Sequence, residues 1–315
     1  MKSILALWVA FMPSMMMACD VCGIFLGIQP HDRTSTVSLL YRYRRLEGSL
    51  PGTLSLAKHG GHDAAVPNDT RHCELYMAAE LRADLWLTER LAILASMLAV
   101  NNYRAVDGVI ANDVYGIGDP LLLARYMMVN TRCKTPDERT AHRLMIGAGG
   151  KAPLGRHDAR YNDELVPHDQ QPGTGSWDAL ASIEYSVRRG RNGGSITVIG
   201  RRNGATDEGH RMGHGVSTTA EVFRRFDIGD DWKVLPSLGA YHELAGKDAH
   251  GGDAIDGTGS STLFTHAGLR VWWRSWGFQG AFQYAVARQL GEQMIPNRER
   301  FVVGITRNLK QHTNQ

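Results

Sequence analysis

Residues 73–86, CELYMAAELRADLW, alternate apolar and polar side chains along almost their whole length. A period of two residues predicts a β-strand with one apolar face and one polar face. The stretch is longer than an ordinary globular strand of about 5–6 residues. It is long enough for a tilted crossing of a bilayer, which needs roughly 9–11 residues. Because similar stretches recur along the chain, the sequence predicts an all-β fold, a transmembrane antiparallel up-and-down β-barrel of about twelve strands.

The connections between these stretches differ in length in a regular way. Long polar connections cover residues 48–71, 153–174 and 246–259, whereas short ones cover residues 88–89 and 190–193. Outer-membrane barrels have short periplasmic turns and longer external loops. The difference in length therefore predicts which strand ends face the outside.

The alternation also gives the expected limits of each strand. The predicted strands cover residues 34–46, 72–87, 90–103, 117–130, 140–152, 175–189, 194–203, 213–227, 232–245, 260–274, 276–290 and 299–309. Tryptophans near the predicted short turns indicate an aromatic girdle at one membrane interface. These tryptophans are Trp86, Trp232, Trp272, Trp273 and Trp276.

The N-terminus has a different composition from the barrel region. A short apolar run after Lys2 predicts a signal peptide over residues 1–18, cleaved near Ala18. We therefore expect export to the bacterial outer membrane, a periplasmic segment over residues 19–33 and a barrel domain over residues 34–315. The expected partners are outer-membrane lipid, the outer-membrane assembly machinery and a small solute. The net charge of +3 is too small to indicate a nucleic-acid partner.

The cysteines permit several chemistries. Cys19 and Cys22 form a CxxC pattern in the segment CDVCG. Three interpretations stay open for them: lipidation of Cys19, which would make the chain a lipoprotein, a local disulfide in the oxidising envelope, or half of a soft-metal site. Cys73 is expected at the outer rim and Cys133 in a periplasmic turn. A hydrocarbon layer of about 30 Å then separates these two cysteines, so no disulfide is expected between them.

The first long connection carries residue types that ligate metals. Imidazole, carboxylate and thiolate groups suit zinc or copper. The alternative is a solvated loop whose polar residues need no partner. The candidate ligands are His59, His62, Asp63, His72 and Cys73.

The polar faces of the predicted strands carry charges of both signs. In a water-filled channel such residues tune selectivity. The alternative is that they pair and plug the lumen, because a bore of about twelve strands lies between filled barrels of about 8 and porins of 16–18. The expected pore-lining residues are Arg42, Arg44, Glu74, Glu80, Arg82, Asp84, Asp119, Arg125, Lys151, Asp178, Glu184, Arg188, Arg270 and Arg288.

Enzymatic barrels are the competing class of function. Such an enzyme needs a nucleophile beside a histidine on a rim. His242 with Glu243, and His266 near Ser260 and Ser261, are the candidates. No nucleophile motif surrounds them, so the sequence predicts no enzymatic activity.

Three glycine-containing motifs carry a family resemblance: GIGDP at 116–120, GKAPLG at 150–155 and QPGTGSWD at 171–178. Their order and spacing resemble an outer-membrane barrel family named for a role in the meta-pathway of phenol degradation. The CDVCG segment resembles a subgroup of that family. The resemblance implies an outer-membrane channel, so we expect passive movement of a small aromatic or metal-related solute. A plugged barrel that binds metal or has a structural role is the alternative.

Overall fold

The computed structural model describes residues 34–51, 69–131 and 140–309 of the chain. The wall is built from β1 (Thr36–Leu50), β2 (Thr70–Trp86), β3 (Leu91–Val106), β4 (Val109–Ile117), β5 (Leu121–Asn130), β6 (Thr140–Lys151), β9 (Asp178–Arg189), β10 (Asn192–Asn203), β12 (Gly215–Arg224), β13 (Phe226–Ile228), β14 (Trp232–Ala245), β17 (Ser260–Trp273), β18 (Trp276–Leu290) and β19 (Asn297–Asn308). The connections contain β7 (Arg160–Tyr161), β8 (Glu164–Leu165), the 3-10 turn η1 (His168–Gln170), β11 (His210–Arg211), β15 (Ala249–His250) and β16 (Asp253–Ala254).

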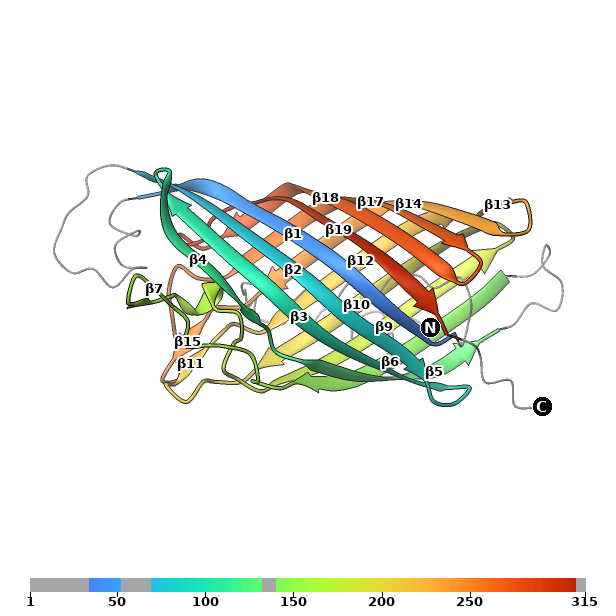
Figure 1. Ribbon diagram of the computed structural model, residues 1–315, viewed down its shortest axis with the longest axis horizontal. Coiled ribbons are helices and arrows are strands. Elements are labelled where there is room, and N and C mark those ends of the chain that lie inside the picture. The colour runs from blue at the N-terminus through green and yellow to red at the C-terminus, as the bar shows by residue number, and fades with distance from the viewer. Residues whose placement is uncertain (1–33, 52–68, 132–139, 310–315) are drawn as a thin grey trace, which may run out of the picture.

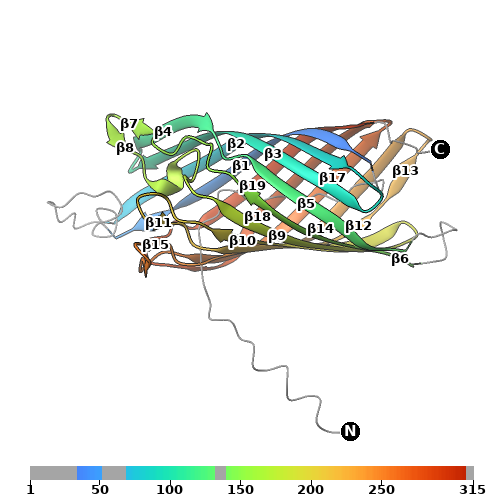
Figure 2. The same cartoon turned by 90° about the horizontal axis from the view of Figure 1, so that it is seen from below.

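These elements form one closed antiparallel barrel of 12 wall strands. Antiparallel pairing of β1 with β19, from Thr36↔Asn308 to Arg44↔Arg300, closes the ring. β4 and β5 both pair with β3, so together they serve as one interrupted wall strand. Both views show tilted strands, with β7, β11 and β15 at one end of the barrel and the β13 turn at the other (Figures 1 and 2). The predicted fold class is confirmed.

The alternating stretch from Cys73 to Trp86 is the greater part of β2. Its even-numbered residues, such as Glu74 and Glu80, are buried inside the ring, whereas Leu81 on the other face is 58% exposed. Successive side chains of a strand point to opposite faces. The barrel therefore encloses the polar face and turns the apolar face outward.

The outer surface of the wall is strongly apolar. Large exposed apolar side chains occur on nearly every wall strand, as expected for a surface that faces lipid. They include Leu39, Leu81, Met97, Leu122, Ile183, Val222, Leu238, Phe282 and Val303. No helix in the described part of the chain has the length and apolar character of a membrane span.

The structure corrects two expectations about the wall. The fourth predicted strand began at residue 117, but its outer half, β4, begins at Val109 after a two-residue turn at Asp107 and Gly108, with φ of 49° and 82°. Asp-Gly is a common two-residue hairpin turn. Trp272 does not belong to an outer girdle, since it is buried against Phe223 and Leu235 inside the barrel.

Trp86 also lies on the inner face, packed against Ala92, Met127 and Met145. It occupies an even position of β2, like the enclosed Glu74. Trp232 and Trp273 stack on each other at 5.9 Å, and both are exposed. The girdle expectation therefore failed for the two tryptophans on inward-facing positions of their strands.

Candidate functional site

The three motifs of the sequence meet at Lys151, the last residue of β6. Lys151 Nζ lies 2.9 Å from Asp119 Oδ2 and 2.8 Å from Asp178 Oδ2, and all three side chains are buried. Gly155 N donates to Asp119 Oδ1 at 2.9 Å. Ser176 Oγ donates to Asp178 Oδ1 at 3.0 Å. Each motif therefore supplies one member of a buried ionic triad, and hydrogen bonds from the loop hold both carboxylates.

The long connection between β6 and β9 folds back onto this triad. Thr174 N and Thr174 Oγ1 each lie 2.8 Å from Asp119 Oδ2. Gly173 and Gly155 lie in such close contact that a Cβ on Gly173 would be 2.6 Å from the Gly155 carbonyl carbon. Only glycine fits this approach without moving the backbone. The glycines of these motifs therefore allow the loop to close over the triad.

Further ion pairs cross the lumen. Arg44 Nη2 on β1 lies 3.1 Å from Glu243 Oε1 on β14, and Arg300 on β19 also contacts Glu243. β19, β18 and β17 separate β1 from β14 in the wall. A contact between strands this far apart in the ring must span the interior. These side chains therefore occupy the bore.

Two more bridges connect wall strands that are not neighbours. Arg125 on β5 contacts Asp84 on β2 and lies 3.1 Å from Glu184 on β9. β3 lies between β2 and β5, and β6 lies between β5 and β9. These side chains therefore lie along the inner surface of the wall and each spans one intervening strand.

The ionic interior is balanced. Over residues 34–51, 69–131 and 140–309, the lumenal ion pairs join eight basic to eight acidic side chains. These are Arg42, Arg44, Arg82, Arg104, Arg125, Lys151, Arg270 and Arg300 with Glu74, Glu80, Asp84, Asp119, Asp178, Glu184, Glu221 and Glu243. Pairing offsets the cost of burying charge. This set therefore adds no net charge to the lumen.

The loop of residues 152–177 is docked inside the mouth at the end of the barrel that carries β7, β11 and β15 (Figure 1). Asn102 Nδ2 on β3 donates to the carbonyl oxygens of Gln170 at 2.9 Å and Gln171 at 3.2 Å. Gln170 Nε2 also donates to the hydroxyl of Tyr76 on β2, and Gln170 is fully buried. The side chain of Gln171 bonds to both backbone groups of Ala159. The loop is thus fastened to the wall and to itself.

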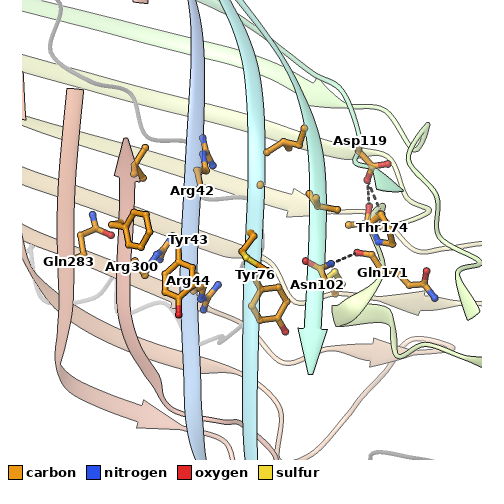
Figure 3. A pocket seen from close by; sticks show the side chains of 18 of the residues that line it. Arg42, Tyr43, Arg44, Tyr76, Asn102, Asp119, Gln171, Thr174, Gln283 and Arg300 are labelled. Atoms are coloured by element: carbon orange, nitrogen blue, oxygen red, sulfur yellow. Dashed lines mark hydrogen bonds between the residues drawn. The ribbon is translucent and has the colours of Figure 1, made fainter. Parts of the chain in front are cut away.

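Two cavities adjoin this docked loop. The inner cavity, of about 70 Å³, lies in the lumen, with Arg42, Arg44 and Arg300 on one side and Gln171 on the other (Figure 3). The mouth cavity, of about 460 Å³, is lined by residues of the loop and of β4, β8 and β11. His168 lines both cavities. Movement of the loop around His168 would therefore change both spaces.

A histidine stack marks this point. The rings of His168 and His210 are parallel within 6°, with centroids 4.0 Å apart. His210 pairs with His250 between β11 and β15. Burial, followed by the neighbouring His168 and His250, lowers the pKa of His210 to about 4. Burial and the neighbouring histidines therefore keep His210 neutral to a lower pH than a free histidine.

The structure places the expected pore-lining residues in two groups. Twelve are enclosed and ion-paired among the described residues, whereas Arg188 and Arg288 are exposed. Four members of the lumenal set lie outside the expected pore-lining residues: Arg104, Arg300, Glu221 and Glu243. Arg104 lies one residue beyond the predicted end of its strand. The alternation of the strand, extended to its true end, would have included it.

The expected metal ligands are not brought together in the described region. His59, His62 and Asp63, like Cys19 and Cys22, lie outside the described residues. His72 is buried and faces inward, whereas Cys73, the next residue of β2, faces outward as a free thiol. Across the described residues, no group of three or more His, Cys, Asp or Glu could hold a metal ion.

The enzymatic candidates are also separated by strand alternation. His242 Nε2 and Ser261 Oγ lie 2.9 Å apart. Glu243, next to His242, points inward and pairs with Arg44 instead. His266 is buried and bonds to Gln283 at 3.1 Å. No carboxylate of the described chain therefore hydrogen-bonds to His242 and orients it.

Comparisons with known proteins identify the fold. No family model and no curated protein matches the chain. The COG4313 outer membrane channel from Pseudomonas putida F1 has a TM-score of 0.59 and 17% identity, covering 90% of this chain and 100% of that one. The β-domain of the Bordetella autotransporter BrkA has a TM-score of 0.45 and 12% identity, covering 88% of this chain and 100% of that one. The TodX monoaromatic hydrocarbon channel has a TM-score of 0.34 and 9% identity, covering 88% of this chain and 90% of that one. The likeness to the Pseudomonas structure shows the fold alone, which is that of an outer-membrane β-barrel.

Proposed function

We propose that this protein is a bacterial outer-membrane channel for the passive movement of a small solute, and that the docked loop holds it closed in this conformation. The apolar outer surface supports placement in a membrane, since exposed apolar side chains alternate with enclosed polar ones along the strands. The observation that carries the proposal is the pair of cavities that share His168. One cavity lies at the mouth and the other in the lumen, with residues 167–172 contributing to both walls.

Opening is proposed for the centre of the loop, while the triad keeps the two ends in place. Asn102 donates two hydrogen bonds to this part, Tyr76 and Asn112 each share one with Gln170, and Val114 packs against Ala159 and Val166. A typical intramolecular hydrogen bond contributes about 0.5–1.5 kcal/mol net. An opening free energy of a few kcal/mol leaves a minor open population. Passive flux through such a minor state is slow, bidirectional and not coupled to an energy source.

The resemblance to the phenol-degradation family supports the channel class. Its three motifs build the Lys151 triad and the loop that closes the mouth. The solute is proposed to be aromatic, since Tyr76 and Tyr241, both buried, line the inner cavity together with arginines.

A second candidate is a plugged barrel with a structural or metal-binding role. The balanced ion pairs favour it, because Arg44 and Glu243 bridge strands across the bore. The loop histidines His59 and His62 belong to this candidate as a proposed zinc or copper site.

Solute flux into proteoliposomes separates the two candidates. Swelling with glycerol, arabinose and phenol is measured for the wild type, Asn102→Ala and the control Asn101→Ala, whose side chain lies on the opposite face of β3. The channel proposal expects slow flux in the wild type and the control, and several-fold faster flux in Asn102→Ala. Absence of flux for every solute in all three proteins would favour the plugged barrel.

A further inference from the structure

The mouth cavity is lined by both apolar and polar side chains, and one of them is a buried arginine. Its volume is about 460 Å³. Leu165, Val166, Ile255 and Met294 supply apolar surface from three different connections. Arg104, from the outer end of β3, also lines it and is fully buried. A buried arginine in an apolar cavity is a strong recognition group for an anion.

Arg104 is not saturated by its protein neighbours. Its Nε lies 3.6 Å from Glu74 Oε1, which is an ion pair but longer than a hydrogen bond. Its Nη2 lies 3.2 Å from His72 Nδ1. Its Nη1 and Nε have no hydrogen-bond partner in the described chain. Buried donors are nearly always hydrogen-bonded, so this guanidinium has capacity for a further acceptor.

The neighbours of Arg104 are held in other interactions. Tyr76 donates its hydroxyl to Glu74 Oε2 at 3.0 Å. Arginine is always a donor, so His72 Nδ1 accepts from Arg104, and His72 Nε2 faces Thr70 Oγ1 at 2.9 Å. His72 is thus assigned as neutral. Glu74 is the charged group paired with Arg104 inside the wall.

The remaining polar groups of the cavity are mostly engaged elsewhere. Gln293 Nε2 donates to the carbonyl of Asp256, and Thr258 Oγ1 donates to the carbonyl of Ile255. Asp248 Oδ1 accepts from a backbone N–H at 2.8 Å. Of the acidic lining residues, Glu164 is exposed, and Asp169 acts electrostatically on His210. Arg104 is the buried arginine of a lining that also carries these acidic side chains.

We propose that the mouth cavity binds an apolar monocarboxylate, with the ligand carboxylate on Arg104 Nη1 and its ring or hydrocarbon body against Val166, Ile255 and Met294. This inference rests on the proposed channel function and names the class of solute that the mouth captures. A neutral aromatic compound would make the same apolar contacts but would leave Arg104 Nη1 without an acceptor. The cavity therefore discriminates by charge as well as by shape.

The test is equilibrium binding of benzoate and of benzamide, its neutral near-isostere, to the purified full-length barrel in detergent. We expect the wild type to bind benzoate at least tenfold more tightly than benzamide. Arg104→Gln should lower benzoate affinity to the level of benzamide and leave benzamide affinity unchanged. Arg156→Gln, which changes an exposed arginine of the same loop, should leave both affinities at wild-type values.

A second variant covers the case in which loss of the buried Arg104 prevents folding. Ala111 lines the cavity from β4 and is exposed, so Ala111→Trp should fill the space and weaken both ligands without touching Arg104. Equal affinity of the wild type for benzoate and benzamide would overturn the proposal, as would unchanged binding in Ala111→Trp. Binding in detergent does not depend on flux. Benzoate binding without any solute flux would support the binding site and contradict the proposed channel function.

Discussion

Lys151 Nζ and Asp178 Oδ2 lie 2.8 Å apart, both buried, and they join the last residue of β6 to the first residue of β9. The long loop between these residues leaves the wall and returns to it at this ion pair. Asp119, at the break between β4 and β5, contacts the same ammonium group at 2.9 Å. One lysine thus fixes both ends of the loop that is docked in the mouth.

Removal of this lysine should destabilise the barrel. Lys151→Met leaves two buried carboxylates without their cation, and breaking a buried pair in this way costs about 3–5 kcal/mol. Thermal unfolding, followed by the heat-dependent gel mobility of the folded barrel, should shift clearly downward. Lys247→Gln removes an exposed pair with Asp256 and should leave the transition unchanged. An unshifted transition in Lys151→Met would show that the triad does not hold the wall.

The loop also depends on glycine at position 173. A Cβ there would meet the Gly155 carbonyl carbon at 2.6 Å, so Gly173→Ala should force the loop away from the triad. Limited proteolysis within residues 152–177 should become several-fold faster than in the wild type. Gly200→Ala, where nothing lies within 4 Å of the added carbon, is the control. Equal cleavage of both variants would contradict the packing argument.

The bridge between Arg44 and Glu243 places one charge of each sign in the bore. Arg44→Gln removes a positive charge and Glu243→Gln removes a negative one from the same contact. In planar bilayers under a potassium chloride gradient, the reversal potential of the first variant should shift toward cation selectivity and that of the second toward anion selectivity. Shifts of the same sign, or none in either variant, would place the conducting path away from this contact.

Acid should loosen the histidine stack. The pKa of His210 is lowered to about 4 when the loop is docked, and an undocked histidine titrates near 6.5. The undocked form binds the proton more tightly. The contribution of His210 to the stability of the docked loop is therefore largest above about pH 6.5. This stabilisation is lost as the pH falls toward 4, and it does not change further below that value.

Proteolysis of the loop at pH 7, 5 and 4 measures this dependence. Cleavage by an acid-tolerant protease, normalised to an unfolded substrate, should accelerate as the pH falls in the wild type. His210→Phe keeps a ring beside His168 and lacks the proton, so this dependence should largely disappear. His168, His250 and Asp169 are the other titratable groups acting on His210. An identical pH profile in the variant would assign the effect to one of them.

The sequence predicted the wall far better than the contacts inside it. Alternation along residues 73–86 correctly separates Glu74 and Glu80 from Leu81 because strand geometry is local. The same argument fails where a turn is short, as at Asp107 and Gly108. A strand pattern that continues through a two-residue hairpin hides the reversal.

The partners of the lumenal charges could not be predicted. Arg44 and Glu243 are 199 residues apart, and their contact depends on the circumference of the barrel and the stagger of its strands. The docking of Gln170 onto Asn102 is similar, since it depends on the path of a long irregular loop. The triad at Lys151 could be predicted in part. Each of the three motifs was identified in the sequence, but the contact between them was not predicted.

If the docked loop closes a conducting bore, its removal should raise the conductance. Single-channel conductance in planar bilayers should be compared between the wild type and a variant in which residues 158–171 are replaced by a short Gly-Ser linker, which keeps Gly155, Thr174 and the Lys151 triad. We expect a low, intermittent conductance for the wild type and a several-fold larger, stable conductance for the variant. Equal conductance of the two proteins, or silence of both with a folded barrel, would contradict this expectation.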